Sequence, residues 1–135
     1  MPVRVLRRLF VCISLITLLA TLPHGFANAA PKFDADTRAQ LQLALREHIT
    51  DNTSNDSYRY FDPDKGETRL FRLKLLHPVI FEKDGFFLMC ADFRDAQNED
   101  IILDYVLHRS SDGFRVEQIV KGRRSFLMTV FERVF

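Results

Sequence analysis

Apolar and polar residues alternate along the chain from Tyr58 to Lys121, and a period of two is typical of β-strands that are buried on one face. Four clusters of turn-forming residues interrupt the alternation, at 62–66, 83–85, 95–98 and 110–113. The pattern therefore predicts five strands, at about 58–61, 68–81, 86–94, 100–109 and 114–121. Pro78 has no N–H to donate, so it predicts a bend or an edge position in the long second strand.

A helical pattern comes before the strands. Asp34 or Asp36 can cap a helix that runs to about Asp51. Side chains suited to a core recur along it three and four positions apart; they are Leu41, Ala44, Leu45, His48 and Ile49. This spacing predicts one long amphipathic helix whose apolar face packs on the sheet.

The pattern changes again after Gly122. Apolar side chains then recur at helical spacing, at Phe126, Leu127, Val130, Phe131 and Val134. A short C-terminal helix fits this spacing, and a sixth strand is the alternative because Phe, Thr and Val prefer strands. The predicted fold class is α+β: one long N-terminal helix packed on a four- or five-stranded antiparallel meander, with a short C-terminal helix.

The register of the last three strands follows from the apolar positions, because a slip of one residue would exchange the two faces. Pairing Arg94 with Asp100 and Arg109 with Phe114 gives one apolar face, which the helix must cover: Phe87, Met89, Ala91, Phe93, Ile101, Leu103, Tyr105, Leu107, Phe114, Val116 and Val120, interrupted only by Gln118. The other side, here called the mixed face, carries Leu88, Cys90, Asp92, Ile102, Asp104, Val106, His108, Arg115, Glu117, Ile119 and Lys121.

An apolar strip of the mixed face requires a cover. It consists of Leu88, Ile102, Val106 and Ile119, and contiguous apolar surface on a soluble protein usually marks a contact. We expect either residues 126–134 or the same strip of a second chain to cover it, which would make a homodimer.

The first 29 residues have the three parts of a signal peptide. Arg4, Arg7 and Arg8 precede an uncharged run over 9–22, and Ala27-Asn28-Ala29 forms a small-residue cleavage site. A transmembrane anchor would need ~20 apolar residues, so we expect cleavage, and no stable membrane anchor after it. The paired arginines leave the twin-arginine route open beside the general one. Residues 30–135 would then be a single exported domain.

The charge balance and the cysteine content limit the functional classes and the cellular locations that are possible for this protein. Removal of the leader leaves 16 basic and 18 acidic side chains, and this balance excludes the strongly basic footprint of a nucleic-acid binder. Cys90 is then the one remaining cysteine, so no intramolecular disulfide can form. Small domains secreted by eukaryotic cells usually carry several, which favours a bacterial periplasmic or secreted location.

One long helix followed by an antiparallel meander resembles the cystatin-like fold, and more loosely the NTF2-like group. Gln118, Ile119, Val120, Lys121 and Gly122 also match the Q-x-V-x-G loop with which cystatins inhibit cysteine proteases. In that family the loop belongs to an early hairpin, whereas here it ends the last predicted strand. These folds serve inhibitors, ligand carriers and enzymes alike, so the resemblance implies a fold and no single function.

Two further sets of residues are candidates for catalysis and for metal binding. Asp92, Asp104 and His108 share the mixed face with Cys90, and carboxylates near an imidazole can perform acid–base catalysis. The case for metal binding is weaker, because the acidic loop 62–67 lacks the spacing of a calcium site and suits a hairpin turn. The candidate zinc ligands, which are His48, His77 and His108, come from separate elements without paired spacing. His48 is interpreted as a core residue.

The sequence thus predicts an exported, non-catalytic binding module without cofactor or metal. Its predicted binding surface is Leu88, Cys90, Ile102, Val106 and Ile119, and its partner is an unidentified protein or small molecule, with no nucleic acid. The alternatives are a small NTF2-like enzyme that uses Asp92, Asp104 and His108, and a protease inhibitor that uses residues 118–122.

Overall fold

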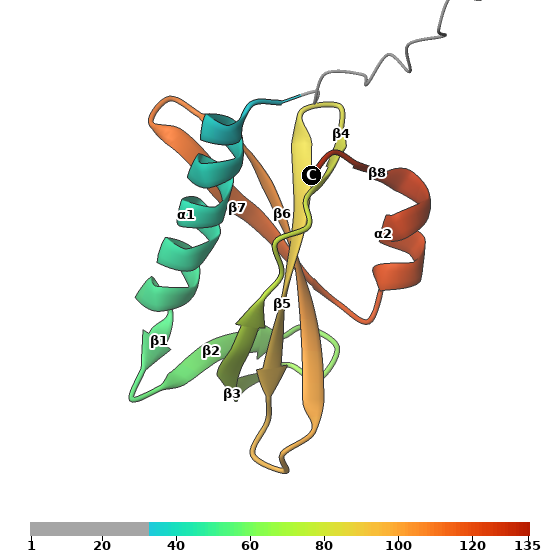
Figure 1. Cartoon of the computed structure of the whole chain (residues 1–135). Coiled ribbons are helices and arrows are strands. Elements are labelled where there is room, and N and C mark those ends of the chain that lie inside the picture. Colours follow the sequence, from blue (N-terminus) through green and yellow to red (C-terminus); the bar gives the residue numbers. More distant parts are fainter. Residues whose placement is uncertain (1–32) are drawn as a thin grey trace, which may run out of the picture.

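The computed structural model describes residues 33–135 (Figure 1). The predicted signal peptide, residues 1–29, lies outside the described residues. The elements are α1 (Ala35–Asp51), β1 (Thr53–Ser54), β2 (Ser57–Asp62), β3 (Glu67–Leu76), β4 (Phe81–Lys83), β5 (Phe86–Arg94), β6 (Asp100–Ser110), β7 (Gly113–Lys121), α2 (Arg124–Val130) and β8 (Glu132–Arg133). No helix in this part of the chain has the length and apolar character needed to span a membrane.

Helix α1 begins and ends close to the predicted positions. Asp34 is its N-cap, and its Oδ1 accepts a hydrogen bond from the Thr37 N–H at 2.8 Å, which satisfies one of the free donors of the first turn. The helix ends at Asn52, whose N–H and side-chain amide both donate to the His48 carbonyl. Its buried side chains are Leu41, Leu45 and Ile49.

The sheet is antiparallel and open, and β5 is its central strand. One edge of β5 pairs with β6, and β6 pairs with β7. Along the other edge, β3 pairs with the second half of β5 and β4 with the first half. β2 continues the sheet beyond β3, and the short strands β1 and β8 lie at its ends.

The sheet has eight strands where four or five were predicted. Two causes account for the difference. The predicted long strand 68–81 is divided into β3 and β4, because the segment around Pro78 leaves the sheet. Strands β1 and β8 have two residues each, and two residues are too few to show an alternating pattern.

The predicted register of β5 and β6 is confirmed. Arg94 lies opposite Asp100, and Cys90 lies opposite Asp104. The side chains predicted for the helix-covered face form the core, with Phe87, Met89, Ala91, Phe93, Leu103, Tyr105 and Leu107 all buried against α1. The alternation was sufficient here because the pairing of these strands is regular along its whole length.

The predicted register of β7 is correct only in its first half. Arg109 lies opposite Phe114 as expected, but Val106 lies opposite Gln118 while Leu107 lies opposite Val116. Glu117 is therefore the extra residue of a β-bulge. The bulge turns Ile119 to the helix side, where it packs on the core, so the predicted position of Ile119 on the mixed face was wrong. Gln118 and Val120 move to the opposite face for the same reason.

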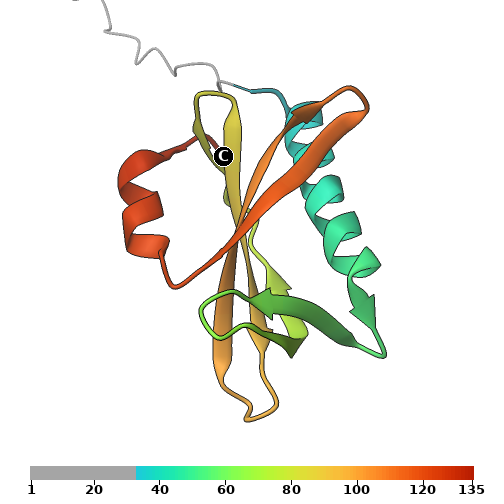
Figure 2. The same ribbon diagram turned by 180° about the vertical axis from the view of Figure 1, so that it is seen from behind.

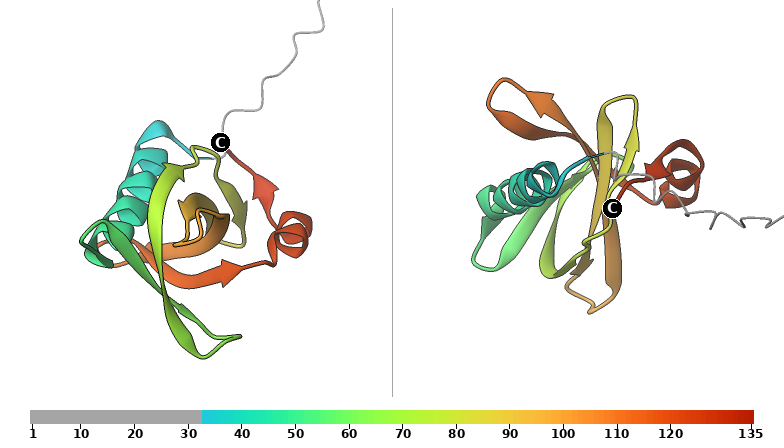
Figure 3. Two further views of the ribbon diagram at one scale, coloured as in Figure 1. Left: turned by 90° about the horizontal axis from the view of Figure 1, so that it is seen from below. Right: turned by 45° about the horizontal axis from the view of Figure 1, so that its top comes forward.

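The sheet coils so that its two ends approach each other (Figures 2 and 3). Asp62, at the end of β2, is fully buried, and its carboxylate accepts a hydrogen bond from Lys121 at the end of β7. Arg69 adds a second cation, 4.0 Å from the same carboxylate oxygen. These contacts join β2 to β7, which are not hydrogen-bonded neighbours in the sheet.

The C-terminal segment passes around the β4 edge. Helix α2 lies on the side of the sheet opposite α1 (Figures 1 and 3), and β8 then pairs with β4. The Phe135 ring ends on the helix side, 6.5 Å from the ring of Phe33. The segment thus contains both a short helix and a short strand, which were the two alternatives predicted for it.

Candidate functional site

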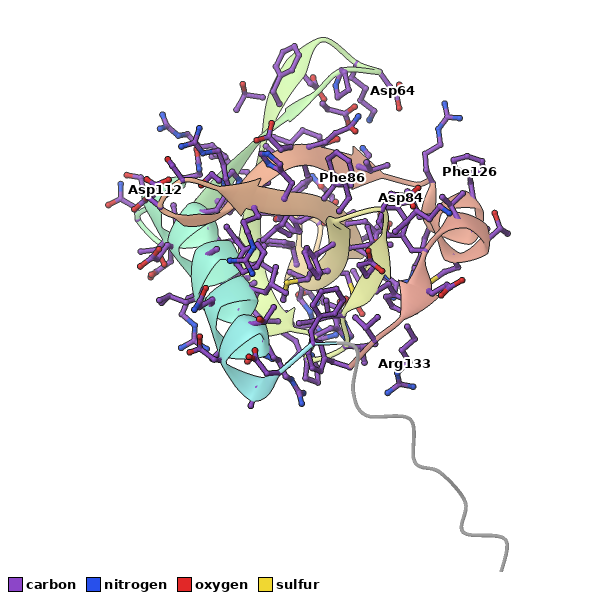
Figure 4. All side chains as sticks on the ribbon, turned by 90° about the horizontal axis from the view of Figure 1, so that it is seen from above. Asp64, Asp84, Phe86, Asp112, Phe126 and Arg133 are labelled. Atoms are coloured by element: carbon purple, nitrogen blue, oxygen red, sulfur yellow. The ribbon has the colours of Figure 1, made fainter. Side chains whose placement is uncertain are left out.

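Helix α2 covers part of the mixed face. Leu88 and Cys90 are almost fully buried, while Val106 is half-buried. Ile102 keeps 43% of its surface exposed. Only Leu127 of the predicted apolar face of α2 is buried, and Phe126 lies on the outer side of the helix (Figure 4). Of the predicted strip, Leu88 is therefore covered, Val106 is covered in part, Ile102 stays exposed and Ile119 lies on the other face.

An ion pair between the half-exposed Arg124 and a buried carboxylate links α2 to this face. The Asp104 side chain is 2% exposed, and its Oδ1 accepts a hydrogen bond from Arg124 Nη1 at 2.8 Å. Burial raises the pKa of the Asp104 carboxyl, while Arg124 opposes this effect. Burial also raises the pKa of the Cys90 thiol, so Cys90 is not an activated nucleophile.

The three predicted catalytic residues do not form one cluster. Asp92 lies opposite Ile102, two positions from Asp104 along the sheet, but His108 is four residues farther along β6, about 13 Å away at the rise of a strand. His108 Nδ1 lies 3.1 Å from Glu117 Oε1, and its ring stacks on Phe86. His108 therefore contacts Glu117 and Phe86 and lies apart from Asp92 and Asp104.

A different histidine contacts Asp92. His77 follows β3, and its Nε2 lies 2.9 Å from Asp92 Oδ1. Sequence reasoning missed this pair, because a bulge at Lys74 sets the register of β3 against β5. Among residues 33–135, no group of three or more His, Cys, Asp or Glu side chains has the arrangement of a metal site.

The Q-x-V-x-G segment is not a free loop. Gln118, Ile119, Val120 and Lys121 belong to β7 and pair with β6. Gly122 follows with a φ of 74°. A cystatin-type inhibitor needs this segment exposed and free to insert into a protease, and the pairing with β6 removes that freedom.

A groove lined by aromatic, aliphatic and polar side chains lies where the coiled sheet leaves β2 and β7 facing each other. It has a volume of 370 Å³, within the ~300–1,000 Å³ typical of ligand sites. We call it the β2–β7 groove. It is lined by His48 of α1 and the C-cap residue Asn52, by Tyr58, Arg59, Tyr60 and Phe61 of β2 and Pro63 just after it, and by Val116, Glu117, Gln118 and Ile119 of β7.

A cluster of aromatic rings forms the inner wall of this groove. The His48 ring meets the Tyr105 ring edge-on, with 5.9 Å between the ring centres. Its Nε2 lies 3.5 Å from the Tyr58 hydroxyl, which is the long limit of a hydrogen bond. The Tyr105 hydroxyl is buried and has no hydrogen bond of normal geometry to the described residues. Tyr105 lies behind the lining of the groove, where its hydroxyl and that of Tyr58 influence each other's pKa.

Burial shifts the pKa of three groups in this wall away from neutral pH. It lowers the pKa of His48, although Asp51 opposes the shift. It raises the pKa of Tyr58 and of Tyr60, and the carboxylate of Asp62 adds to the shift of Tyr60. The imidazole is therefore neutral and both phenols are protonated at neutral pH, so each can donate or accept a hydrogen bond.

Sequence reasoning identified only part of this groove. His48 was on the predicted apolar stripe, and Gln118 was the one polar interruption of the predicted apolar face. Nothing in the alternation indicates that β2 and β7 face each other, because this depends on the coiling of the whole sheet. A larger groove of 560 Å³, lined by Ile49, Thr50, Thr53, Asn55, Asp56, Arg72 and Leu73, contains no aromatic ring.

Comparison of the chain with known protein families gives no match, and comparisons with curated proteins and with solved structures give none either.

Proposed function

We propose that this protein is a non-catalytic binding module of the bacterial cell envelope, periplasmic or secreted, which holds a small molecule in the β2–β7 groove. The observation that carries the proposal is a groove of 370 Å³ between β2 and β7 whose lining includes the exposed Arg59, Phe61 and Gln118. Apolar walls with a few converging polar groups are the general character of ligand sites.

The location rests on the sequence. Arg4, Arg7 and Arg8, the short apolar run and Ala27-Asn28-Ala29 support export and cleavage. One long helix before an antiparallel sheet supports the resemblance to the cystatin-like fold, in which ligand carriers occur.

The groove replaces the binding surface expected from the sequence. Leu88 and Cys90 are buried on the side of the sheet where α2 lies, so a ligand cannot reach them directly, and Ile119 has moved to the other face, where it lines the β2–β7 groove instead. Ile102 is the exposed remainder of that surface, and with Asp104, Lys121 and Arg124 it lines a groove of 410 Å³ that contains no aromatic ring.

The enzyme alternative requires His108 near Asp92 and Asp104, and His108 lies elsewhere on the sheet. His108 is paired with Glu117, and His77 is the histidine that contacts Asp92. Asp104 is already engaged by Arg124. Because the Asp104 carboxylate already accepts a hydrogen bond from Arg124, a structural role suits Asp104 better than the role of a general acid.

The proposal is tested by screening small aromatic and polar fragments against the isotope-labelled, exported protein by NMR. We expect the amide shifts caused by bound fragments to cluster at residues 58–61 and 116–119. The exposed Gln118 allows Gln118→Trp to fill the groove and abolish these shifts, while Gln97→Trp in the β5–β6 turn leaves them unchanged. Shifts that cluster around Ile102 and Arg124, or a complete absence of binding fragments, would overturn the proposal.

A further inference from the structure

The lining of the β2–β7 groove combines two kinds of side chain. Phe61 supplies an aromatic ring that is 61% exposed, whereas Tyr58 and Tyr60 are buried on the other face of β2. Asn52, Arg59 and Gln118 supply planar polar groups at the rim. An amide or a guanidinium presents two hydrogen-bonding atoms in one plane. The rim can therefore form hydrogen bonds with two neighbouring polar atoms of a ligand.

The net charge of the lining indicates an uncharged ligand. Arg59 and Glu117 are the one cation and the one anion among the lining residues when His48 is neutral. Glu117 is held by His108 at 3.1 Å, and Lys121, near the Tyr60 ring, is engaged by Asp62. The groove therefore presents no excess charge with which to attract an anion or a cation.

A sugar matches both features. One face of a pyranose ring is made of C–H groups and packs on an aromatic ring, which has an electron-rich face. Its edge carries adjacent hydroxyls, each of which donates and accepts hydrogen bonds. Paired hydroxyls suit planar amide and guanidinium groups, and a sugar carries no charge to be balanced.

We propose that the β2–β7 groove binds a neutral saccharide, with the sugar ring on the exposed Phe61 and its hydroxyls bonded to Asn52, Arg59 and Gln118. The inference rests on the proposed function and names the ligand class for the same groove.

The test uses maltose, cellobiose and N,N′-diacetylchitobiose as probes in NMR titrations of the exported protein. At least one should shift the resonances of 58–61 and 116–119. Phe61→Ala should weaken that binding about tenfold. Leu70→Ala is the matched control, because Leu70 is 55% exposed on the adjoining strand β3 but does not line the groove, and it should bind like the unchanged protein.

Three results would overturn the inference. No probe shifts the groove resonances although small fragments still bind there, which leaves the proposed function standing. Phe61→Ala and Leu70→Ala weaken binding equally, which places the sugar elsewhere. Neither sugars nor fragments bind, which removes the proposed function as well. Amide spectra of both variants establish that they are folded, and both positions are exposed enough for this to be expected.

Discussion

Burial keeps the His48 imidazole neutral at a position where its ring still reaches the β2–β7 groove. A residue can therefore belong to the core and to the site together, and His48 was expected only in the first role. Its neutral ring packs on Tyr105, whereas protonation would place a charge against buried aromatic rings.

The pH dependence of stability should show this. The pKa of His48 is lower in the folded protein than in the unfolded chain, so the unfolded chain binds the proton more tightly. Its contribution to stability is complete above pH 6.5 and is lost as pH falls from that value through the folded pKa. In His48→Gln the decline between pH 7.5 and pH 5 should be shallower, as measured by urea unfolding. Equal declines would mean that His48 does not titrate differently on folding.

The two faces of the central strands differ most sharply at Met89 and Ile102. Met89 is buried under α1, whereas Ile102 is 43% exposed on the mixed face. Met89→Asp should cost more than about 4 kcal/mol, because it buries an unpaired charge, and Ile102→Asp should cost less than about 1 kcal/mol. Chemical denaturation of the two variants compares them directly, and similar losses would contradict the assignment of faces.

At the scale of elements, the free strand edges carry the same protective feature. β7 has an unpaired edge along its length, and β3 has one beyond Phe71, within the described part of the chain. Each contains a bulge whose extra residue is charged, Glu117 in β7 and Lys74 in β3. Bulges and charges on edge strands hinder pairing with other molecules, so we expect these two positions to oppose extension of the sheet into a second copy.

This protection can be removed at one position. Lys74→Val leaves Arg94 to hold Asp100 but takes the charge from the β3 edge. We expect concentration-dependent self-association of this variant by sedimentation velocity. Lys65→Val makes the same change in the β2–β3 turn, and its sedimentation should be the same as that of the parent protein. If both variants stay monodisperse at every concentration, the charge at Lys74 does not guard the edge.

The elements also show where sequence reasoning succeeds. α1 was predictable because Leu41, Leu45 and Ile49 keep helical spacing and Asp34 is a good cap. β5 and β6 were predictable because their pairing is unbroken. The bulge at Glu117 was not, since one extra residue leaves alternation intact on either side of it. Its trace in the sequence was Gln118, which did not fit the face to which it was assigned.

The whole molecule depends on contacts between segments that the sheet does not connect. Lys121 and Asp62 join β7 to the β2–β3 hairpin across the β2–β7 groove, and Lys121 lowers the pKa of the Asp62 carboxyl. Pairings over such sequence distances leave no local signal, so the groove could not be predicted from periodicity.

Lys121→Met should loosen the hairpin selectively. The methionine retains an apolar chain near the Tyr60 ring but leaves the buried Asp62 with Arg69 as its nearest cation. We expect faster amide hydrogen exchange in β2 and in 67–71, with β5 and β6 still protected. Arg123→Met, which changes an exposed arginine just before α2, is the control. Uniform acceleration over all strands would show that the hairpin does not open by itself.

The tyrosine cluster has an optical consequence. The sequence contains three tyrosines and no tryptophan, and the three are Tyr58, Tyr60 and Tyr105, all at or directly behind the β2–β7 groove. The intrinsic ultraviolet fluorescence of the protein therefore originates at this one place. Quenching or a change in emission lifetime on adding a compound reports occupancy of the groove, with no dye attached and no residue replaced.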